Sequence, residues 1–207
     1  MVVCAFHSLC LGKITNPIMM ALDFLFLPSD PLKRALVGYK QKWHLGVKPV
    51  IGIHVRLGNQ NPEFNDQKRH TLEQIPLFVQ CASHIEEYFH LPNSTRWLVA
   101  ADSPRGFQEI LKYSPPHKVI SVQPPVIIHT EKTVGYKARE NMLFVFLEQM
   151  LLARTDYLIL SHSGYGTIAS AWGDVKGPFD FKTCNSFVDA ASQIDHARER
   201  HSIDRIE

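Results

Sequence analysis

The segment Pro49-Val50-Ile51-Gly52-Ile53-His54-Val55-Arg56-Leu57-Gly58 decides the fold prediction. Residues 49–55 are rich in β-branched and apolar side chains and predict a buried strand. A strand that is apolar throughout, without alternation, is typical of a parallel sheet covered by helices on both faces. Arg56 leaves this strand at its carboxyl end, and Gly58 permits a sharp turn or a close backbone approach.

Similar apolar segments follow along the chain and alternate with helical patterns. Further strands are predicted over 97–101, 118–122 and 157–160, and helices over 71–89, 104–113, 138–153 and 165–172. Asp102 or Ser103 is expected to cap the helix that begins at Pro104. This alternation predicts an α/β domain with a doubly wound, mainly parallel, Rossmann-like sheet and right-handed crossovers.

The composition is that of a globular protein and excludes some partners. The chain has 207 residues, of which 45% are hydrophobic and 20% charged, and its formal net charge is +2. Such a balance argues against nucleic acid as a partner, so any bound anion needs a local site. No membrane span is expected, because the apolar run over 2–11 is shorter than the roughly 20 residues that a span requires.

The cysteines and one three-residue motif give information on the cellular compartment of the protein. Cys4, Cys10, Cys81 and Cys184 form no C-x-x-C pair, so no zinc site is predicted. Buried free thiols are the expected state, although an even number also permits disulfides. Asn93-Ser94-Thr95 is an N-glycosylation acceptor triplet in an expected loop and favours a secretory-pathway lumen.

Three predicted strand ends carry polar residues. Ligands of open parallel sheets bind beyond the carboxyl ends of the strands. Arg56 either makes a salt bridge or holds two phosphate oxygens with its planar guanidinium, and its position at the strand end favours the second; His54 is either a core histidine or a ligand contact. Asp102 is either a plain helix cap or an acceptor for a ribose hydroxyl or a base edge. The segment 161–167, Ser-His-Ser-Gly-Tyr-Gly-Thr, is either a tight capped turn or an anion site at a helix N-terminus.

These segments together resemble a known superfamily. His54-Val55-Arg56-Leu57-Gly58 resembles the H-x-R-x-G motif of α1,2-, α1,6- and protein O-fucosyltransferases. The segments ending in Ala101-Asp102-Ser103 and spanning 160–167 are similar to its second and third motifs, and residues 21–32 resemble the segment before the first motif. The resemblance covers residues 16 to 172. It implies the C-terminal, GDP-sugar-binding half of a GT-B-type glycosyltransferase, with GDP-fucose as donor and inversion at the sugar carbon. It also implies no cofactor and no required metal, and the chain has no D-x-D triplet.

The resemblance also implies roles for individual residues. Arg56 would hold the β-phosphate and stabilise departing GDP. The implied donor contacts are His54, Arg56, Gly58, Asn59, Asp102, Ser161, Ser163, Gly164 and Tyr165. Asn59 stands where many members have an acidic residue. The glutamate that acts as base in core α1,6 members aligns with Phe64, so the neighbouring Glu63, with Asp66, is the candidate base; two solvated loop carboxylates are the alternative.

The same resemblance divides the chain into three parts. Residues 1–48 are expected to be a helical segment, 49–176 the GDP-fucose-binding domain, and 177–207 a diverged tail with a helix over 195–205. A GT-B enzyme has two Rossmann-like halves, so the other half and a Golgi membrane anchor are expected outside this chain. The enzyme is expected to act on a glycan acceptor in the Golgi lumen. Two alternatives stay open: a catalytically incomplete nucleotide-binding remnant, and an unrelated α/β protein that binds another nucleotide. NAD is disfavoured, because no G-x-G-x-x-G follows the first strand.

Overall fold

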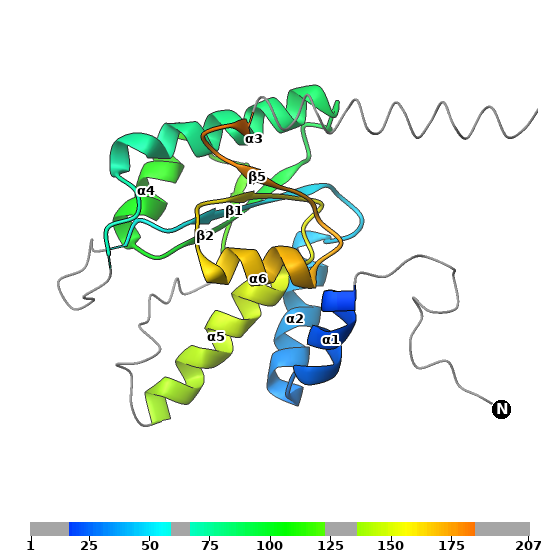
Figure 1. The fold of residues 1–207 in the computed structure, drawn as a ribbon. Helices are drawn as coiled ribbons and strands as arrows, with labels where there is room; N and C mark the ends of the chain where they lie inside the picture. The colour runs from blue at the N-terminus through cyan, green and yellow to red at the C-terminus, as the bar shows by residue number, and fades with distance from the viewer. Residues whose placement is uncertain (1–16, 59–66, 123–135, 185–207) are drawn as a thin grey trace, which may run out of the picture.

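A five-stranded sheet forms the centre of the molecule (Figure 1). The computed structural model describes residues 17–58, 67–122 and 136–184, with the side chains of 136–140 excepted. The strands are β1 (Val50–Val55), β2 (Arg96–Ala101), β3 (Val119–Ile120), β4 (Tyr157–Leu160) and β5 (Lys176–Asp180). Their order is β3-β2-β1-β4-β5 and every pair is parallel, which confirms the predicted α/β class.

The register of β1 with its two neighbours brings the predicted strand ends together. Val55 pairs with Ala101 of β2, and His54 pairs with Leu160 of β4. Because the strands are parallel, the residues that follow these pairs leave the sheet at one common edge. Arg56, Asp102 and Ser161 therefore begin from adjacent positions at what we call the carboxyl edge.

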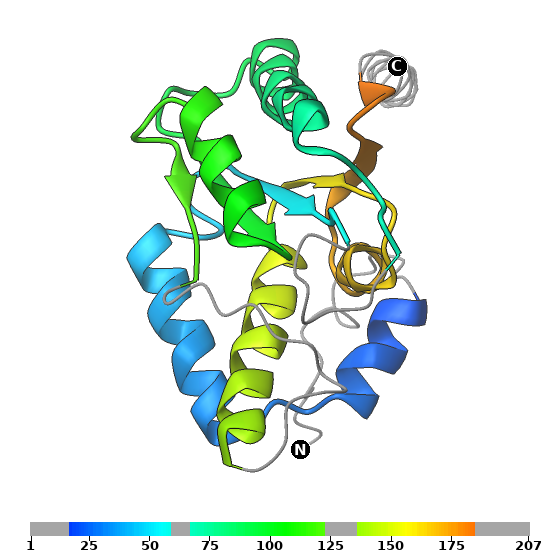
Figure 2. The same cartoon turned by 90° about the vertical axis from the view of Figure 1, so that its left-hand side faces the viewer.

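Helices cover both faces of the sheet. They are α1 (Pro17–Leu25), α2 (Asp30–Trp43), the short 3₁₀ helix η2 (Leu72–Gln74), α3 (Ile75–Tyr88), α4 (Pro104–Tyr113), α5 (Tyr136–Leu152) and α6 (Gly164–Trp172). Figure 2 shows α3 and α4 on one side of the sheet, with α1, α2, α5 and α6 on the other. The doubly wound arrangement that the apolar strands predicted is therefore confirmed.

Two separate hydrophobic cores hold these layers. Ile51 and Ile53 of β1 belong to the core under α3, where Phe78 is fully buried. Val50 of β1 belongs to the core on the opposite face, together with Leu151 of α5. Side chains of a strand alternate between its faces, so one apolar strand supplies both cores. Each fully buried aliphatic side chain contributes roughly 1.5–3 kcal/mol, which explains why β1 is apolar apart from His54.

The structure contains one strand that the sequence pattern did not predict. β5 pairs with β4 from Lys176 to Asp180, with an irregular register in between. Gly177 and Pro178 interrupt the apolar pattern, and Phe179 is the buried residue of this strand. The domain boundaries at 48 and 176 stay predictions. The helix expected over 195–205 lies outside the described residues.

The expectation of free thiols is wrong for two of the cysteines. Cys81 of α3 and Cys184 form a disulfide, with their Cα atoms 5.6 Å apart. The sequence separation of 103 hid this pairing, because only the folded chain places the segment after β5 against α3, where Phe181 stacks on Phe78. Cys4 and Cys10 lie outside the described residues. The described helices include none long and apolar enough to cross a lipid bilayer.

Candidate functional site

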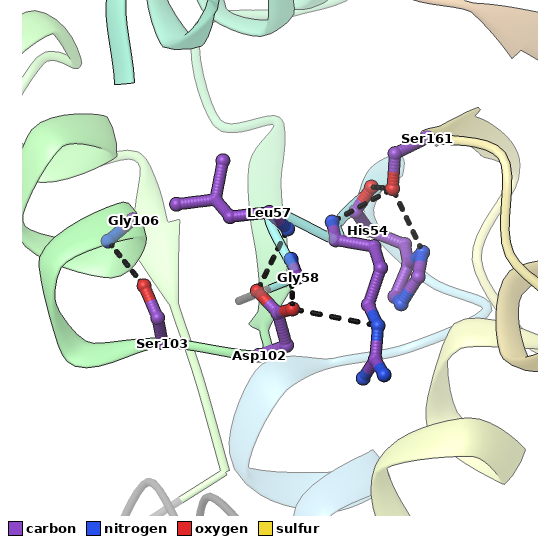
Figure 3. Close-up of polar contacts among 8 residues, drawn as sticks. His54, Leu57, Gly58, Asp102, Ser103, Gly106 and Ser161 are labelled. Carbon is purple, nitrogen blue, oxygen red and sulfur yellow. Dashed lines mark hydrogen bonds and ion pairs between the residues drawn. The ribbon is translucent and has the colours of Figure 1, made fainter. Parts of the chain in front are cut away.

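Ser161 joins the ends of β1 and β4 at the carboxyl edge. The main-chain N–H of Arg56 donates to Ser161 Oγ at 2.7 Å, and that hydroxyl donates to the carbonyl of His54 at 3.1 Å (Figure 3). Ser161 has no exposed surface. Its hydroxyl therefore fixes the backbone on which Arg56 stands, and it is enclosed rather than open to a ligand.

Asp102 holds the segment that follows β1. Its Oδ1 accepts from the N–H of Leu57 at 2.9 Å, and its Oδ2 accepts from the N–H of Gly58 at 2.8 Å (Figure 3). Oδ2 also lies 3.4 Å from Nε of Arg56. Gly58 has a φ of +65°, a conformation that glycine adopts without strain and that turns its N–H toward the carboxylate. Asp102 is thus an internal anion that sets the path of the backbone and one side of the guanidinium.

The ion pair between Arg56 and Asp102 lies at the surface of the site. The side chain of Arg56 is 36% exposed and that of Asp102 is 14% exposed. Because the contact with Asp102 uses Nε, it fixes the orientation of the guanidinium plane from one side. A charge-assisted contact of this kind limits the directions in which an arginine side chain can point.

Ser103, and not Asp102, caps α4. Its hydroxyl accepts from the N–H of Gly106 at 2.9 Å, which leaves the carboxylate of Asp102 for the β1 end (Figure 3). Gly106 allows close packing here, because a Cβ at this position would lie 3.1 Å from Leu57 Cδ1. The cap and the packing together anchor the start of α4 against the residue next to Arg56.

His54 is a buried neutral residue beneath the site. Burial, assisted by the charge of Arg56, lowers its pKa from 6.5 to about 3. Its ring lies 5.3 Å from the ring of Tyr165, and Nδ1 lies 3.4 Å from Ser161 Oγ. A Cβ on Gly166 would come within 3.0 Å of Nδ1, so this glycine lets α6 pack directly on the histidine.

The N-terminus of α6 provides main-chain donors at the same edge. Ser163 stands at the cap position in an extended conformation, and its side chain makes no capping bond. Gly164 has open space where a Cβ would be. The first-turn N–H groups and the helix dipole make such an end suitable for an anion. His162 in the preceding turn contacts Asp180 of β5, Nε2 to Oδ2, at 3.1 Å.

A partly buried acid, Glu148 of α5, lies beside α6 and was not predicted from the sequence. The hydroxyl of Tyr165 donates to the carbonyl of Val145 at 2.7 Å, and Glu148 Oε2 lies 3.5 Å from the same oxygen. Burial raises the pKa of Glu148 to about 8 and raises that of Tyr165 well above its usual value. The hydroxyl of Tyr165 also faces Glu148 Oε2 as a donor, and this contact opposes the rise in the pKa of Glu148 that burial causes. The sequence contained one sign of this contact, which is the acidic side chain of Glu148 within the mainly apolar run 142–152.

The structure thus separates the predicted residues into groups. It brings Arg56, Gly58 and Asp102 into direct contact, and Ser163 and Gly164 follow on the neighbouring strand end. The hydroxyl of Tyr165 faces α5 rather than the edge. Asn59, Glu63 and Asp66 lie outside the described residues. Over the ranges that are described, no cluster of His, Cys, Asp or Glu is arranged to hold a metal ion.

A hollow of about 490 Å³ lies at the opposite, amino edge of the sheet. It includes Asp156 and Tyr157 at the start of β4 and Lys176 at the start of β5. Asp156 is already engaged, because its Oδ2 accepts from the N–H of Val50 at 2.8 Å. Open parallel sheets bind ligands at their other edge, so we assign the candidate site to the carboxyl edge.

Comparisons with known proteins give structural similarity only. No protein-family model matches the chain, and no curated protein matches it significantly in sequence. Among solved structures, a NodZ α-1,6-fucosyltransferase co-crystallised with GDP is 18% identical, with 73% of this chain and 44% of that chain covered and a TM-score of 0.48. The fucosyltransferase NodZ from Bradyrhizobium is 16% identical, with 68% of this chain and 41% of that chain covered and a TM-score of 0.44. A NodZ α-1,6-fucosyltransferase soaked with GDP-fucose is 16% identical, with 70% of this chain and 42% of that chain covered and a TM-score of 0.44. The chain spans less than half the length of these structures, and the similarity does not bear on its activity.

Proposed function

We propose that this chain is the donor-binding half of a GT-B-type fucosyltransferase, which transfers fucose from GDP-fucose to a glycan hydroxyl. One observation carries the proposal. Arg56 leaves the central strand at the carboxyl edge with its Nε beside Asp102 and its main chain bonded to Ser161. The H-x-R-x-G resemblance of residues 54–58 supports GDP-fucose as the ligand of this arginine.

The diphosphate would lie between Arg56 and the N-terminus of α6. Both begin on adjacent strands, because His54 pairs with Leu160. A guanidinium on one side and main-chain N–H groups on the other are the two kinds of donor that bind phosphate oxygens most often. Ser163 and Gly164 line this position, and the open space at Gly164 gives the ligand access to the main chain.

The proposed reaction inverts the sugar carbon. An acceptor hydroxyl attacks the anomeric carbon of fucose from the face opposite the diphosphate and gives its proton to a base, for which Glu63 is the candidate. The bond to the β-phosphate oxygen breaks, and GDP leaves with the electron pair. Arg56 stabilises the charge that develops on the leaving group, which is a large contribution when the donor is pre-oriented. Asp102 acts as a positioning residue because it holds Nε. The reaction proposed here requires no metal.

We also propose that the chain works in the Golgi lumen. The disulfide between Cys81 and Cys184 supports this location, because disulfides persist in the oxidising secretory pathway and are rare in the cytosol.

The test of donor binding is a thermal-shift and calorimetric titration with GDP and GDP-fucose. Ligand at 100 times its dissociation constant is expected to stabilise the protein by about 2.7 kcal/mol. Arg56→Ala is expected to abolish the shift, and Arg56→Lys to restore only part of it, because an ammonium lacks the planar fork. Arg96→Ala, at the opposite end of the neighbouring strand, is the matched control and should bind as the unaltered chain does. No shift at millimolar GDP would contradict the proposal.

Turnover and ligand choice separate the alternatives. Fucose transfer or GDP-fucose hydrolysis by the purified chain supports an active enzyme, whereas GDP binding without turnover supports a catalytically incomplete nucleotide-binding module. Equal binding of GDP, UDP and ADP would instead indicate an unrelated α/β protein with another ligand.

A further inference from the structure

The acceptor triplet noted in the sequence lies at the tip of a tight turn. The turn joins α3 to β2, and both the main-chain N–H and the hydroxyl of Thr95 donate to the carbonyl of Pro92, at 2.9 and 2.7 Å. Asn93 and Ser94 are exposed at the tip, while Thr95 is buried. The asparagine amide is thus presented to solvent on a short, well-defined support.

The turn lies at the amino edge of the sheet, away from the candidate site. Asn93 precedes β2, whereas Asp102 follows it, so the whole strand of six residues separates them. At 3.2–3.4 Å per residue this strand is about 20 Å long. A bulky group on Asn93 would therefore leave Arg56 and the N-terminus of α6 accessible.

A second feature indicates the compartment in which such a group is attached. The disulfide between Cys81 and Cys184 links α3, the helix that leads into this turn, to the end of β5. Disulfides of this structural kind form in the lumen of the secretory pathway, where N-glycosylation also takes place. The sequence triplet, its exposure and the disulfide are three separate observations that agree.

We propose that Asn93 is an N-glycosylation site. The amide nitrogen of Asn93 forms a bond to the anomeric carbon of the reducing-end sugar of a lipid-diphosphate-linked oligosaccharide. The bond from that carbon to the diphosphate oxygen breaks, the lipid diphosphate leaves with the electron pair, and the amide loses one proton. The hydroxyl of Thr95 is enclosed in the folded turn, so transfer precedes the closure of the turn during synthesis.

The direct test uses the protein isolated from the cells that produce it. The chain is treated with peptide-N-glycosidase in heavy-oxygen water, digested and analysed by mass spectrometry. Asn93 is expected to be recovered as aspartate that carries the heavy oxygen, and the intact chain is expected to gain mobility on a gel. Recovery of most Asn93 as an unmodified amide without enzyme treatment would overturn the proposal.

Variants of the full chain, directed into the secretory pathway by an added signal sequence, sharpen the test. Asn93→Gln is expected to lose the whole glycosidase-sensitive mobility shift. Ser94→Ala keeps the triplet and changes an equally exposed neighbour, so it is expected to keep the shift. A shift that persists in Asn93→Gln, or an unaltered chain that forms its Cys81–Cys184 disulfide but gains no glycan, would contradict the proposal. GDP binding plays no part in either readout.

Discussion

The two ends of β1 are both held by an aspartate, but in different ways. At the amino end, Asp156 accepts one main-chain N–H, that of Val50, at 2.8 Å. At the carboxyl end, Asp102 accepts the N–H groups of Leu57 and Gly58 and also contacts Nε of Arg56 at 3.4 Å. The first arrangement fixes a strand, whereas the second fixes a strand and orients a charged side chain.

The ion pairs at the two edges of the sheet differ in how far their cations are exposed to solvent. At the amino edge, Lys118 is 7% exposed and lies 2.9 Å from Glu86, which also accepts from the indole N–H of Trp97 at 2.8 Å. At the carboxyl edge, Arg56 is 36% exposed. A pair whose lysine is buried and donates to both oxygens of its carboxylate serves the fold, while an oriented and more exposed cation can serve a ligand. The ion pair at the amino edge is therefore expected to contribute to stability, and the one at the carboxyl edge to ligand binding.

Removing Lys118 should have the largest effect on stability. Lys118→Met leaves the carboxylate of Glu86 in a largely buried position without its cation, so we expect a loss of about 3–5 kcal/mol in the free energy of unfolding. Guanidinium denaturation measures it, and GDP affinity should stay unchanged. The double variant with Glu86→Gln should recover part of the loss. A loss below about 1 kcal/mol would place this pair with ordinary surface ion pairs.

Asp102→Asn should affect both stability and binding. The amide group has one acceptor oxygen for two main-chain donors and no charge for Arg56, so we expect a loss of about 2 kcal/mol in the free energy of unfolding. GDP affinity should fall about tenfold, a change of about 1.4 kcal/mol, because the guanidinium loses its fixed orientation. Titration calorimetry alongside denaturation separates the two effects. Unchanged GDP affinity would show that Asp102 holds only the backbone.

Glu148→Gln should change how stability depends on pH. The folded pKa of Glu148, about 8, lies above its ordinary value of 4.5, so the folded chain keeps a proton that the unfolded chain releases between these values. Stability therefore falls as pH rises from 4.5 to 8, by roughly 2 kcal/mol after relaxation of the site, and the variant lacks this fall. His54 acts oppositely, since its lowered pKa removes stability as pH falls from 6.5 toward 3, and it is present in both proteins. Parallel curves for the two proteins would contradict the raised pKa.

Asp156→Asn is the counterpart of Asp102→Asn and should have the smallest effect. An asparagine oxygen can still accept the single N–H of Val50, so we expect a loss of about 1 kcal/mol in the free energy of unfolding. GDP affinity should not change, since Asp156 precedes β4 at the amino edge. If this variant weakened GDP binding as much as Asp102→Asn does, the division between the two edges would be wrong.

The elements that the sequence predicted well are those with a local pattern. The β-branched run of β1 and the apolar run of β4 correspond to the observed strands, and Ser103 caps α4 as expected. Each of these depends on neighbours in sequence. β5 was missed because Gly177 and Pro178 interrupt its pattern, and only the pairing of Lys176, Phe179 and Asp180 with β4 defines it as a strand.

The candidate site shows the same limit. The position of Arg56 followed from the end of one strand, but the two N–H groups that Asp102 accepts depend on the left-handed turn at Gly58 and on the register of β1 with β2. Glu148 lies within a helix that the sequence predicts as apolar, and its contact with Tyr165 of α6 appears only in the folded chain. The bonds of Asp102 and the surroundings of Glu148 depend on contacts between segments that are far apart in the sequence, which local sequence patterns do not contain.

The disulfide divides the described strands into those inside a covalent ring and one outside it. Of the five described strands, β2 to β5 lie between Cys81 and Cys184 in the chain, and β1 lies before them. The covalent ring restricts the unfolded states of the four later strands and leaves β1 unrestricted. The strand that leads to Arg56 is therefore held only by packing and by hydrogen bonds to β2 and β4, whereas the other four strands are also joined by a covalent link.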